Sequence, residues 1–298
     1  MLTFIAILLD GLVYSAWLFI VALGLTLIYG VMRIVNVAHG SFYALGAYVA
    51  ASAMGYYFAR GWWPPASYLI IPGAAVLVGV PLGLLLERGA LRLFYGRGEI
   101  ILVLVTYAIF LILEDAMKLV WGVDPYYSVQ PYSLLGTVSV GGMPYAVYDL
   151  CLVGAALSLG ALVWWGLNRT RAGKLLAAVI HDREMSVAFG VNVTPVFAAT
   201  FALGAVLGAL AGALTAPEIT VVPGVGAEVI VLAFAVVVTG GLGSAPGAMV
   251  GALIVGLSRA AVVHLMPSVE LFVIYAVMAL VLAVRPRGLF APARMRQI

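Results

Sequence analysis

The amino-acid sequence predicts an all-α, polytopic membrane protein with about eight to nine transmembrane helices, and three observations support this. Hydrophobic residues make up 65% of the 298 residues and charged residues only 9%, whereas soluble domains carry about 25% charged residues. The mean hydropathy is +1.16. The apolar runs are long and continuous rather than alternating, so helices are expected instead of a β-barrel.

Apolar runs with polar or proline-rich boundaries mark the individual spans. The predicted spans are residues 8–28, 36–57, 66–86, 100–121, 149–167, 195–216 and 268–284. Residues 225–258 are nearly uncharged but shorter than the about 40 residues that two full spans need. A glycine-rich run from Gly240 to Gly247 interrupts residues 225–258. This segment is therefore expected to form either two tight spans or two half-helices that meet at a re-entrant break inside the membrane. Residues 1–298 are expected to form a single transmembrane domain.

The basic residues predict the orientation of the chain. Lys and Arg gather at residues 88–97, 169–183 and 285–296. Because cytoplasmic segments of membrane proteins are enriched in Lys and Arg, these clusters are expected in the cytoplasm together with the C-terminus. Residues 122–148 contain neither residue type, so they are expected outside, as is the N-terminus. The first apolar run lacks the basic start of a cleaved signal peptide and is expected to be retained in a multi-pass protein of the cytoplasmic membrane.

The longest polar interruption covers residues 169–194, which we call the coupling segment. Its charged residues are Arg169, Arg171, Lys174, Asp182, Arg183 and Glu184. Two interpretations are open from polarity and placement. The segment is either an ordinary positively charged cytoplasmic loop or a docking surface for a soluble partner.

The sequence contains no pattern typical of an enzyme or a metal site. No nucleophile–base pair or metal-ligand spacing stands out, and the glycine-rich run lacks the Lys of a phosphate-binding loop. The one cysteine, Cys151, excludes an intrachain disulfide. The net charge of +3 comes from the clusters of Lys and Arg that mark the cytoplasmic segments, so no nucleic-acid partner is expected. We therefore expect no catalytic activity and no metal or cofactor bound by this chain.

Polar residues within predicted spans are the candidates for a transport pathway, because such groups are costly in lipid unless they serve a function. The candidates are Asn36, His39, Ser41, Glu228, Thr239, Gly240, Gly241, Gly243 and Ser244. Glu228 is expected to be the deepest carboxylate among the ionisable residues near spans. For His39 the alternative is a packed, hydrogen-bonded side chain, and for the glycines it is a plain turn. The row Gly204, Gly208 and Gly212 predicts close packing between helices.

Four ordered motifs together resemble one family of transporters. Residues 24–40 read GLTLIYGVMRIVNVAHG, and Leu45 to Tyr48 continue the motif. The second motif consists of Thr170, Gly173, Asp182, Met185, Gly190 and Asn192. Residues 240–248 (GGLGSAPGA) and 285–290 (RPRGLF) complete the set. Over essentially its whole length the chain resembles the LivH-type permeases, which are membrane subunits of branched-chain amino acid ABC importers.

This resemblance implies a function and a set of partners. The chain would be the permease subunit of an ATP-driven importer for branched-chain or other hydrophobic amino acids, forming the substrate pathway by alternating access. It would assemble in the lipid membrane with a second homologous permease, two cytoplasmic ATP-binding subunits that hold ATP and Mg, and a periplasmic substrate-binding protein. The residues expected to contact the ATPase are Leu175, Leu176, Val179, Ile180, Asp182, Arg183, Met185 and Gly190.

Two departures from the family pattern are visible, and alternative functions stay open. The family usually has a basic residue near Ala177, but residues 175–178 are all apolar here, and Thr239 stands where an aliphatic residue is common. The alternatives are a permease for a related small solute, such as urea, an amide, an aromatic acid or a sugar, and an ion-coupled secondary transporter.

Overall fold

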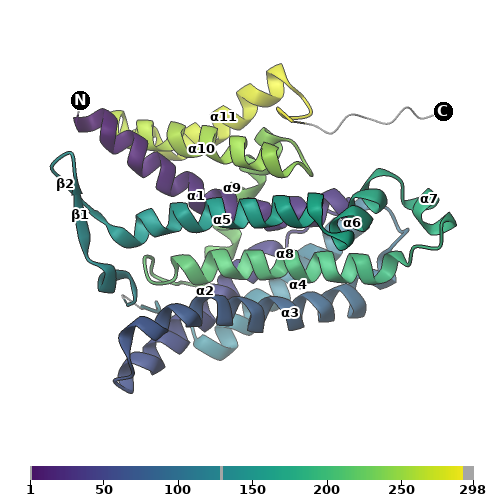
Figure 1. Ribbon diagram of the computed structural model, residues 1–298, viewed down its shortest axis with the longest axis horizontal. Coiled ribbons are helices and arrows are strands. Elements are labelled where there is room, and N and C mark those ends of the chain that lie inside the picture. The colour runs from purple at the N-terminus through teal and green to yellow at the C-terminus, as the bar shows by residue number, and fades with distance from the viewer. Residues whose placement is uncertain (1, 128–129, 291–298) are drawn as a thin grey trace.

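The computed structural model of the protein describes residues 2–127 and 130–290, apart from the side chains of His181, Arg183, Glu184 and Leu271. Most helices run along the long axis of the molecule (Figure 1). The long helices are α1 (Leu2–Met32), α2 (His39–Ala59), α3 (Ile70–Gly89), α4 (Glu99–Trp121), α5 (Val147–Arg169), α8 (Val193–Thr215), α9 (Val225–Gly240), α10 (Ala245–Leu265) and α11 (Glu270–Val284). The shorter elements are η1 (Pro64–Leu69), η2 (Leu91–Phe94), η3 (Tyr132–Leu135), β1 (Thr137–Val140), β2 (Met143–Ala146), α6 (Arg171–His181), α7 (Arg183–Ala188) and η4 (Pro267–Val269).

The two ends of the bundle differ in character. The strands β1 and β2 lie at one end, which we call the hairpin end, and α6 and α7 lie at the other, which we call the basic end (Figure 1). Within the described residues, six helical segments are long and apolar enough to cross a membrane. They are Leu2–Met32, Pro64–Phe94, Glu99–Trp121, Val147–Arg169, Val193–Thr215 and Ala245–Leu265. The predicted class, an all-α polytopic membrane protein, is confirmed.

Helix α8 lies at the centre of the bundle because its small residues let its neighbours approach. A Cβ atom added at Gly212 would overlap the carbonyl oxygen of Tyr43 on α2, and one added at Gly204 would overlap Ile28 on α1. On another face, Gly79 of α3 packs directly on the backbone of Val206. The close packing predicted from the glycine row is therefore confirmed, since any larger side chain would push these helices apart.

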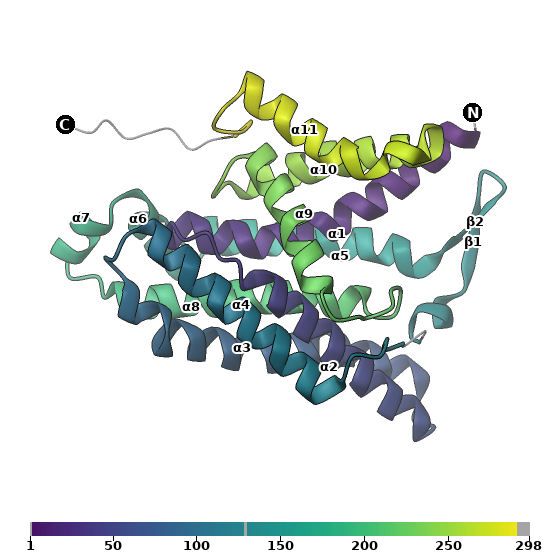
Figure 2. The ribbon, with the colours of Figure 1, turned by 180° about the vertical axis from the view of Figure 1, so that it is seen from behind.

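A non-helical segment, residues 33–38, enters the interior between α1 and α2 (Figure 2). The Oγ1 atom of Thr106 on α4 accepts a hydrogen bond from the Val37 amide (3.2 Å) and donates one to the Val35 carbonyl oxygen (3.3 Å). His39, the first residue of α2, packs against Gly208, about two-thirds of the way along α8. Thus α2 begins deep inside the protein, and the predicted span at 36–57 starts three residues too early.

The glycine-rich run forms the turn that joins α9 to α10. The Ser244 side chain caps α10 by accepting a hydrogen bond from the Gly247 amide (3.1 Å). The amides of Leu289 and Phe290 donate to the carbonyl oxygens of Thr239 (3.1 Å) and Gly240 (2.8 Å). The run therefore joins a helix of 16 residues to one of 21 residues, and the C-terminal motif closes the end of the first. The choice between two tight spans and a re-entrant break at this run stays a prediction.

The connection at the hairpin end contains a small sheet that was not predicted. Strands β1 and β2 pair in antiparallel register, with Thr137 opposite Ala146 and Val140 opposite Met143. Gly141 and Gly142 join them with φ angles of +61° and +86°. Such positive φ angles suit glycine and match the twist of a two-residue hairpin turn. The tyrosine-rich composition of this connection did not indicate strands in the sequence.

Candidate functional site

A cavity of about 520 Å³ lies near the hairpin end, between α1, α5, α8 and α9. Its size falls within the about 300–1,000 Å³ typical of small-molecule sites. The side chains that line it include Asp10, Val13, Tyr14, Trp17, Tyr43, Tyr145, Asp149, Leu152, Thr215, Glu218, Thr220, Val222, Val225, Glu228, Val229, Leu232 and Arg259. Charged groups thus share one partly open space with aromatic and aliphatic side chains.

The aromatic part of the wall is held rigidly by its neighbours. The rings of Tyr14 and Trp17 lie 5.0 Å apart, and the Trp17 ring meets that of Tyr43 edge-on at 6.3 Å. The Tyr43 hydroxyl forms a 2.6 Å hydrogen bond with Oγ1 of Thr215, which joins α2 to the last turn of α8. Because Tyr43 is otherwise buried, this bond satisfies its only polar side-chain atom and fixes the floor of the cavity.

Carboxylates come to the cavity from four separate segments. Asp10 lies on α1, Asp149 on α5, Glu218 in the connection after α8, and Glu228 in the first turn of α9. Oδ2 of Asp149 accepts a hydrogen bond from the Tyr132 hydroxyl (3.1 Å), while the buried Oδ1 has no partner among the described residues. Asp10 contacts His264, with 2.7 Å between Oδ2 and Nε2. The cavity therefore offers acceptor oxygens to a cationic group.

Glu218 is accessible from the cavity, although protein walls surround it on most sides. This partial burial raises the pKa of the Glu218 carboxyl to about 7, and the nearby Asp149 carboxylate contributes further in the same direction. Loss of hydration disfavours the charged form of a carboxyl group, and so does a like charge close by. The charge of the cavity consequently changes near neutral pH.

Arg259 is the basic residue in the lining, and other groups already engage it. Its guanidinium donates a hydrogen bond to Glu270 on α11 and lies over the ring of Tyr14, 4.1 Å from the centroid. A carboxylate partner neutralises the arginine, and the ring quadrupole stabilises it further. Negative charge therefore dominates this cavity, which we call the acidic cavity. It favours a positively charged group on the ligand.

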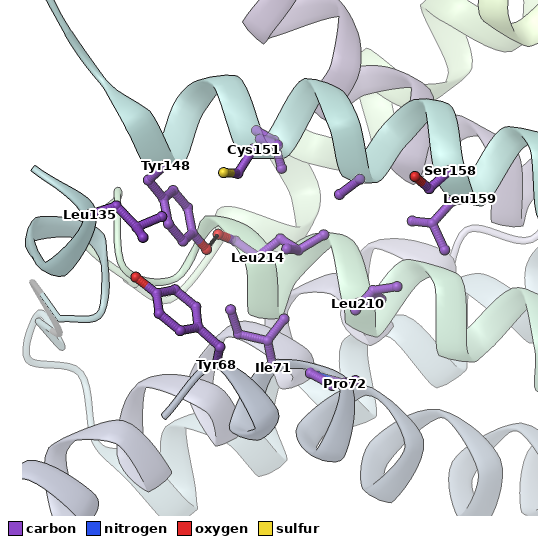
Figure 3. Close-up of a pocket in the computed structure, with 12 residues that line it drawn as sticks. Tyr68, Ile71, Pro72, Leu135, Tyr148, Cys151, Ser158, Leu159, Leu210 and Leu214 are labelled. Atoms are coloured by element: carbon purple, nitrogen blue, oxygen red, sulfur yellow. Dashed lines mark hydrogen bonds between the residues drawn. The ribbon is translucent and has the colours of Figure 1, made fainter. Parts of the chain in front are cut away.

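A second hollow, of about 480 Å³, lies between α3, α5 and α8 and has a different chemistry (Figure 3). It is lined by Tyr68, Ile71, Pro72, Leu135, Tyr148, Cys151, Leu152, Ala155, Ser158, Leu159, Leu210 and Leu214. The Tyr148 hydroxyl donates to the Leu214 carbonyl oxygen (2.5 Å), and that of Tyr68 donates to the Pro131 carbonyl oxygen (3.0 Å). Since its hydroxyls are satisfied internally, this apolar groove offers little to a charged solute.

The sequence matches a family model described as "Branched-chain amino acid transport system / permease component" over residues 7–282. The chain belongs to this family. It is 28% identical to the high-affinity branched-chain amino acid transport system permease protein BraD of Pseudomonas aeruginosa, across 98% of this chain and 97% of that protein. LivH of Escherichia coli K12 is 27% identical, across 97% and 96%. A probable LivH of Methanocaldococcus jannaschii is 27% identical, across 87% and 81%. No solved structure matches the chain.

In this permease, the pathway residues expected from sequence are largely separate from the cavity. All of them lie in the described part of the chain, and of these only Glu228 lines the cavity. The side chains of Asn36 and Ser41 are buried without a protein partner, while Nε2 of His39 lies 3.0 Å from the Val21 carbonyl oxygen. Thr239 and Gly240 end α9, and Gly241, Gly243 and Ser244 lie in the turn that follows, beside the C-terminal motif.

The expectation that Glu228 is the deepest carboxylate is wrong. Glu228 is exposed to the cavity because α9 begins there, whereas Glu114 on α4 is only 8% exposed. The cavity residues that the sequence did not single out as pathway residues come from distant segments. Asp10 and Asp149 are polar residues close to predicted span ends, so that position is the only sequence signal that could have selected them.

The coupling segment folds into the short helices α6 and α7 and is shaped by helix caps. Oγ1 of Thr170 accepts a hydrogen bond from the Gly173 amide (3.0 Å), and Oδ1 of Asp182 accepts one from the Met185 amide (2.9 Å). Oδ1 of Asn192 accepts one from the Thr194 amide (3.1 Å). These polar residues therefore have a structural role in starting α6, α7 and α8.

The predicted ATPase-contacting residues divide into buried and exposed groups. Val179 is 3% exposed, and Leu176 and Ile180 pack beside it against the core. The exposed members are Leu175, Asp182, Met185 and Gly190. The side chain of Arg183 lies outside the described residues. Exposed Val187 and Phe189, the latter 79% exposed, extend the same surface and were not predicted.

Proposed function

We propose that this permease forms the membrane pathway of an ATP-driven importer for branched-chain amino acids, and that the acidic cavity is the outer part of that pathway. The observation that carries the proposal is the lining of the cavity. It combines carboxylates with a wall of aliphatic and aromatic side chains. An amino acid with a branched aliphatic side chain needs both, because its ammonium group requires acceptors and its side chain requires an apolar surface.

The ammonium group would lie between Glu218 and Asp149. Asp149 contributes to the lining from α5, and Glu218, which is exposed, contributes from the connection after α8. The aliphatic side chain would face Val229 and Leu232 on α9 and the ring of Trp17 on α1. Charge-assisted hydrogen bonds are about twice as strong as neutral ones, so the carboxylates would orient the solute.

The basic end would face the cytoplasm and the hairpin end the periplasm of a bacterial inner membrane. Arg88, Arg92 and Lys174 belong to the segments at the basic end, whereas residues 122–148 contain no Lys or Arg. The enrichment of basic residues in cytoplasmic segments supports this orientation. The N-terminus would then lie outside, and residues 285–290 would lie inside.

The exposed apolar side chains of α6 and α7 would bind one of two ATP-binding subunits, where ATP and Mg would be held. Met185, Val187 and Phe189 are exposed together at the basic end, and apolar side chains gathered on a surface mark an interaction site. A second homologous permease would complete the pathway, and a periplasmic binding protein would deliver the substrate at the hairpin end.

Reconstitution in liposomes tests the proposal. Liposomes with the full set of subunits should accumulate labelled leucine with ATP inside, and unlabelled isoleucine or valine should compete while urea should not. Omitting the ATP-binding subunits should abolish uptake. Uptake driven by an ion gradient without them would instead establish a secondary transporter, and competition by urea or an aromatic acid alone would reassign the substrate.

A further inference from the structure

Glu114 is a carboxylate in the interior of the bundle that the proposed pathway does not use. It lies on α4, about two-thirds of the way from the basic end, and is 8% exposed. Oε1 accepts a hydrogen bond from the backbone amide of Gly224 at 2.6 Å. A buried carboxylate is costly in a membrane protein unless it has a defined partner. Its partner is therefore informative about function.

Gly224 is the residue from which α9 starts. Its φ angle is +94°, in the left-handed region, and α9 has no side-chain cap from its own sequence. Glu114 supplies the missing acceptor from 110 positions away in the chain. A negative charge at the start of a helix also interacts favourably with the helix dipole. Glu114 thus serves as the cap of α9, delivered by a different helix.

A second connection, made by a pair of backbone hydrogen bonds, joins the segment after α4 to the segment before α9. The amide of Tyr126, which follows α4, donates to the Val221 carbonyl oxygen at 2.9 Å, and the Val221 amide donates back at 3.0 Å. Both connections act on residues 216–224, which we call the rim loop. The rim loop carries Glu218, Thr220 and Val222 of the cavity lining. Hydrogen bonds from α4 and from the segment after it therefore hold the rim loop, which forms one wall of the cavity, in place.

We propose that Glu114 is a positioning residue that fixes the rim loop and the first turn of α9, and thereby sets the opening of the acidic cavity. Its carboxylate does not line the cavity, so it acts through Gly224 and not by touching the solute. Without this bond the Gly224 amide loses its acceptor, and of the two connections from α4 and the segment after it only the Tyr126–Val221 hydrogen bonds remain. The effect on transport rests on the proposed function, but the effect on the rim loop does not.

Cysteine labelling tests the position of the rim loop without any transport. Val221→Cys, at a rim-loop position whose side chain is fully buried in the parent, would be introduced into a Cys151→Ser background and labelled in liposomes with a membrane-impermeant maleimide. Glu114→Ala should raise the labelling rate about tenfold, because a charged hydrogen bond that restrains the loop is lost. Asp115→Ala is the matched control, since Asp115 is exposed on the same helix and bonds to Lys118. Equal rates for the two variants would overturn the proposal.

A conservative pair keeps the test decisive if Glu114→Ala fails to fold. Glu114→Gln retains an acceptor oxygen but loses the charge, so its labelling rate should lie between those of the parent and Glu114→Ala. Asp115→Asn is its control. Folding would be checked by a single symmetric size-exclusion peak. A Glu114→Gln rate equal to that of Asp115→Asn would count against a positioning role.

Leucine uptake separates this proposal from the proposed function. Glu114→Gln should raise the KM for uptake about tenfold while keeping the maximal rate, because a loosened rim weakens solute capture without touching the ATPase contacts. Faster labelling with unchanged uptake would support the positioning role and contradict the cavity as the pathway. Changed uptake with unchanged labelling would overturn the positioning role itself.

Discussion

Two hollows of similar size use α5 as a wall, yet they differ in what they can bind. The apolar groove measures about 480 Å³ and the acidic cavity about 520 Å³, and Leu152 contributes to both. The groove has hydroxyls that already bond to the protein, whereas the cavity has carboxylates, of which Glu218 and Glu228 are exposed. The volume of a hollow therefore does not identify the pathway. The polar groups that remain available to a solute identify it.

Filling each hollow with the same side chain should give the largest contrast. Val222→Trp places an indole in the acidic cavity, and Ala155→Trp places one in the apolar groove. We expect nearly complete loss of leucine uptake for Val222→Trp and a change within about twofold for Ala155→Trp, as for most substitutions outside a functional site. Uptake in liposomes with matched protein content is the measurement. Equal losses in both variants would remove the distinction between the hollows.

Neutralising the cavity carboxylates should have the next largest effect. Asp149→Asn and Glu218→Gln should each raise the KM for leucine about tenfold to a hundredfold, since each removes a charged partner of the ammonium group. Ser158→Ala is the control in the groove, where the hydroxyl donates to the Gly154 carbonyl oxygen at 2.7 Å. If Ser158→Ala were as harmful as the carboxylate variants, charge in the cavity would not explain the selectivity.

The pH dependence of uptake should give a smaller, graded effect. Burial raises the pKa of the Glu218 carboxyl to about 7, so about a tenth of it is ionised at pH 6 and about nine tenths at pH 8. Because the ammonium group requires the ionised form, the apparent affinity should rise severalfold from pH 6 to pH 8. Glu218→Gln should flatten this part of the profile. A rise of the same size in that variant would assign the dependence to another group.

Some of the spans could be predicted from sequence with small boundary errors, for a physical reason, whereas α1 extends six residues before and four residues beyond the predicted span at 8–28. Lipid contact requires long apolar runs, and polar residues end them, so 100–121 and 149–167 match α4 and α5 within two residues at each end. The start of α2 was misplaced because Thr106, on another helix, satisfies the backbone of residues 33–38. A hydrogen-bond partner on another helix cannot be inferred from the sequence of residues 33–38 themselves.

The candidate site was much less accessible to prediction. Sequence reasoning concentrated on clusters of polar and glycine residues, and in the structure the glycine-rich run closes against the C-terminal motif. The cavity instead collects single polar residues from α1, α5, the rim loop and α9. Each is unremarkable where it stands in the chain. Only Glu228 was both predicted for the pathway and found in the lining.

The sequence by itself determined that the chain is a helical membrane protein, where most of its long helices lie and which family it resembles, because hydrophobicity and short motifs are local properties. The tertiary structure decided which polar groups face one space and which are consumed as caps. Asp182 and Glu114 are both carboxylates, but one starts α7 within its own segment and the other starts α9 from across the bundle. Hydrogen-bond partners are selected by proximity in space, and only the folded chain brings residues 114 and 224 together.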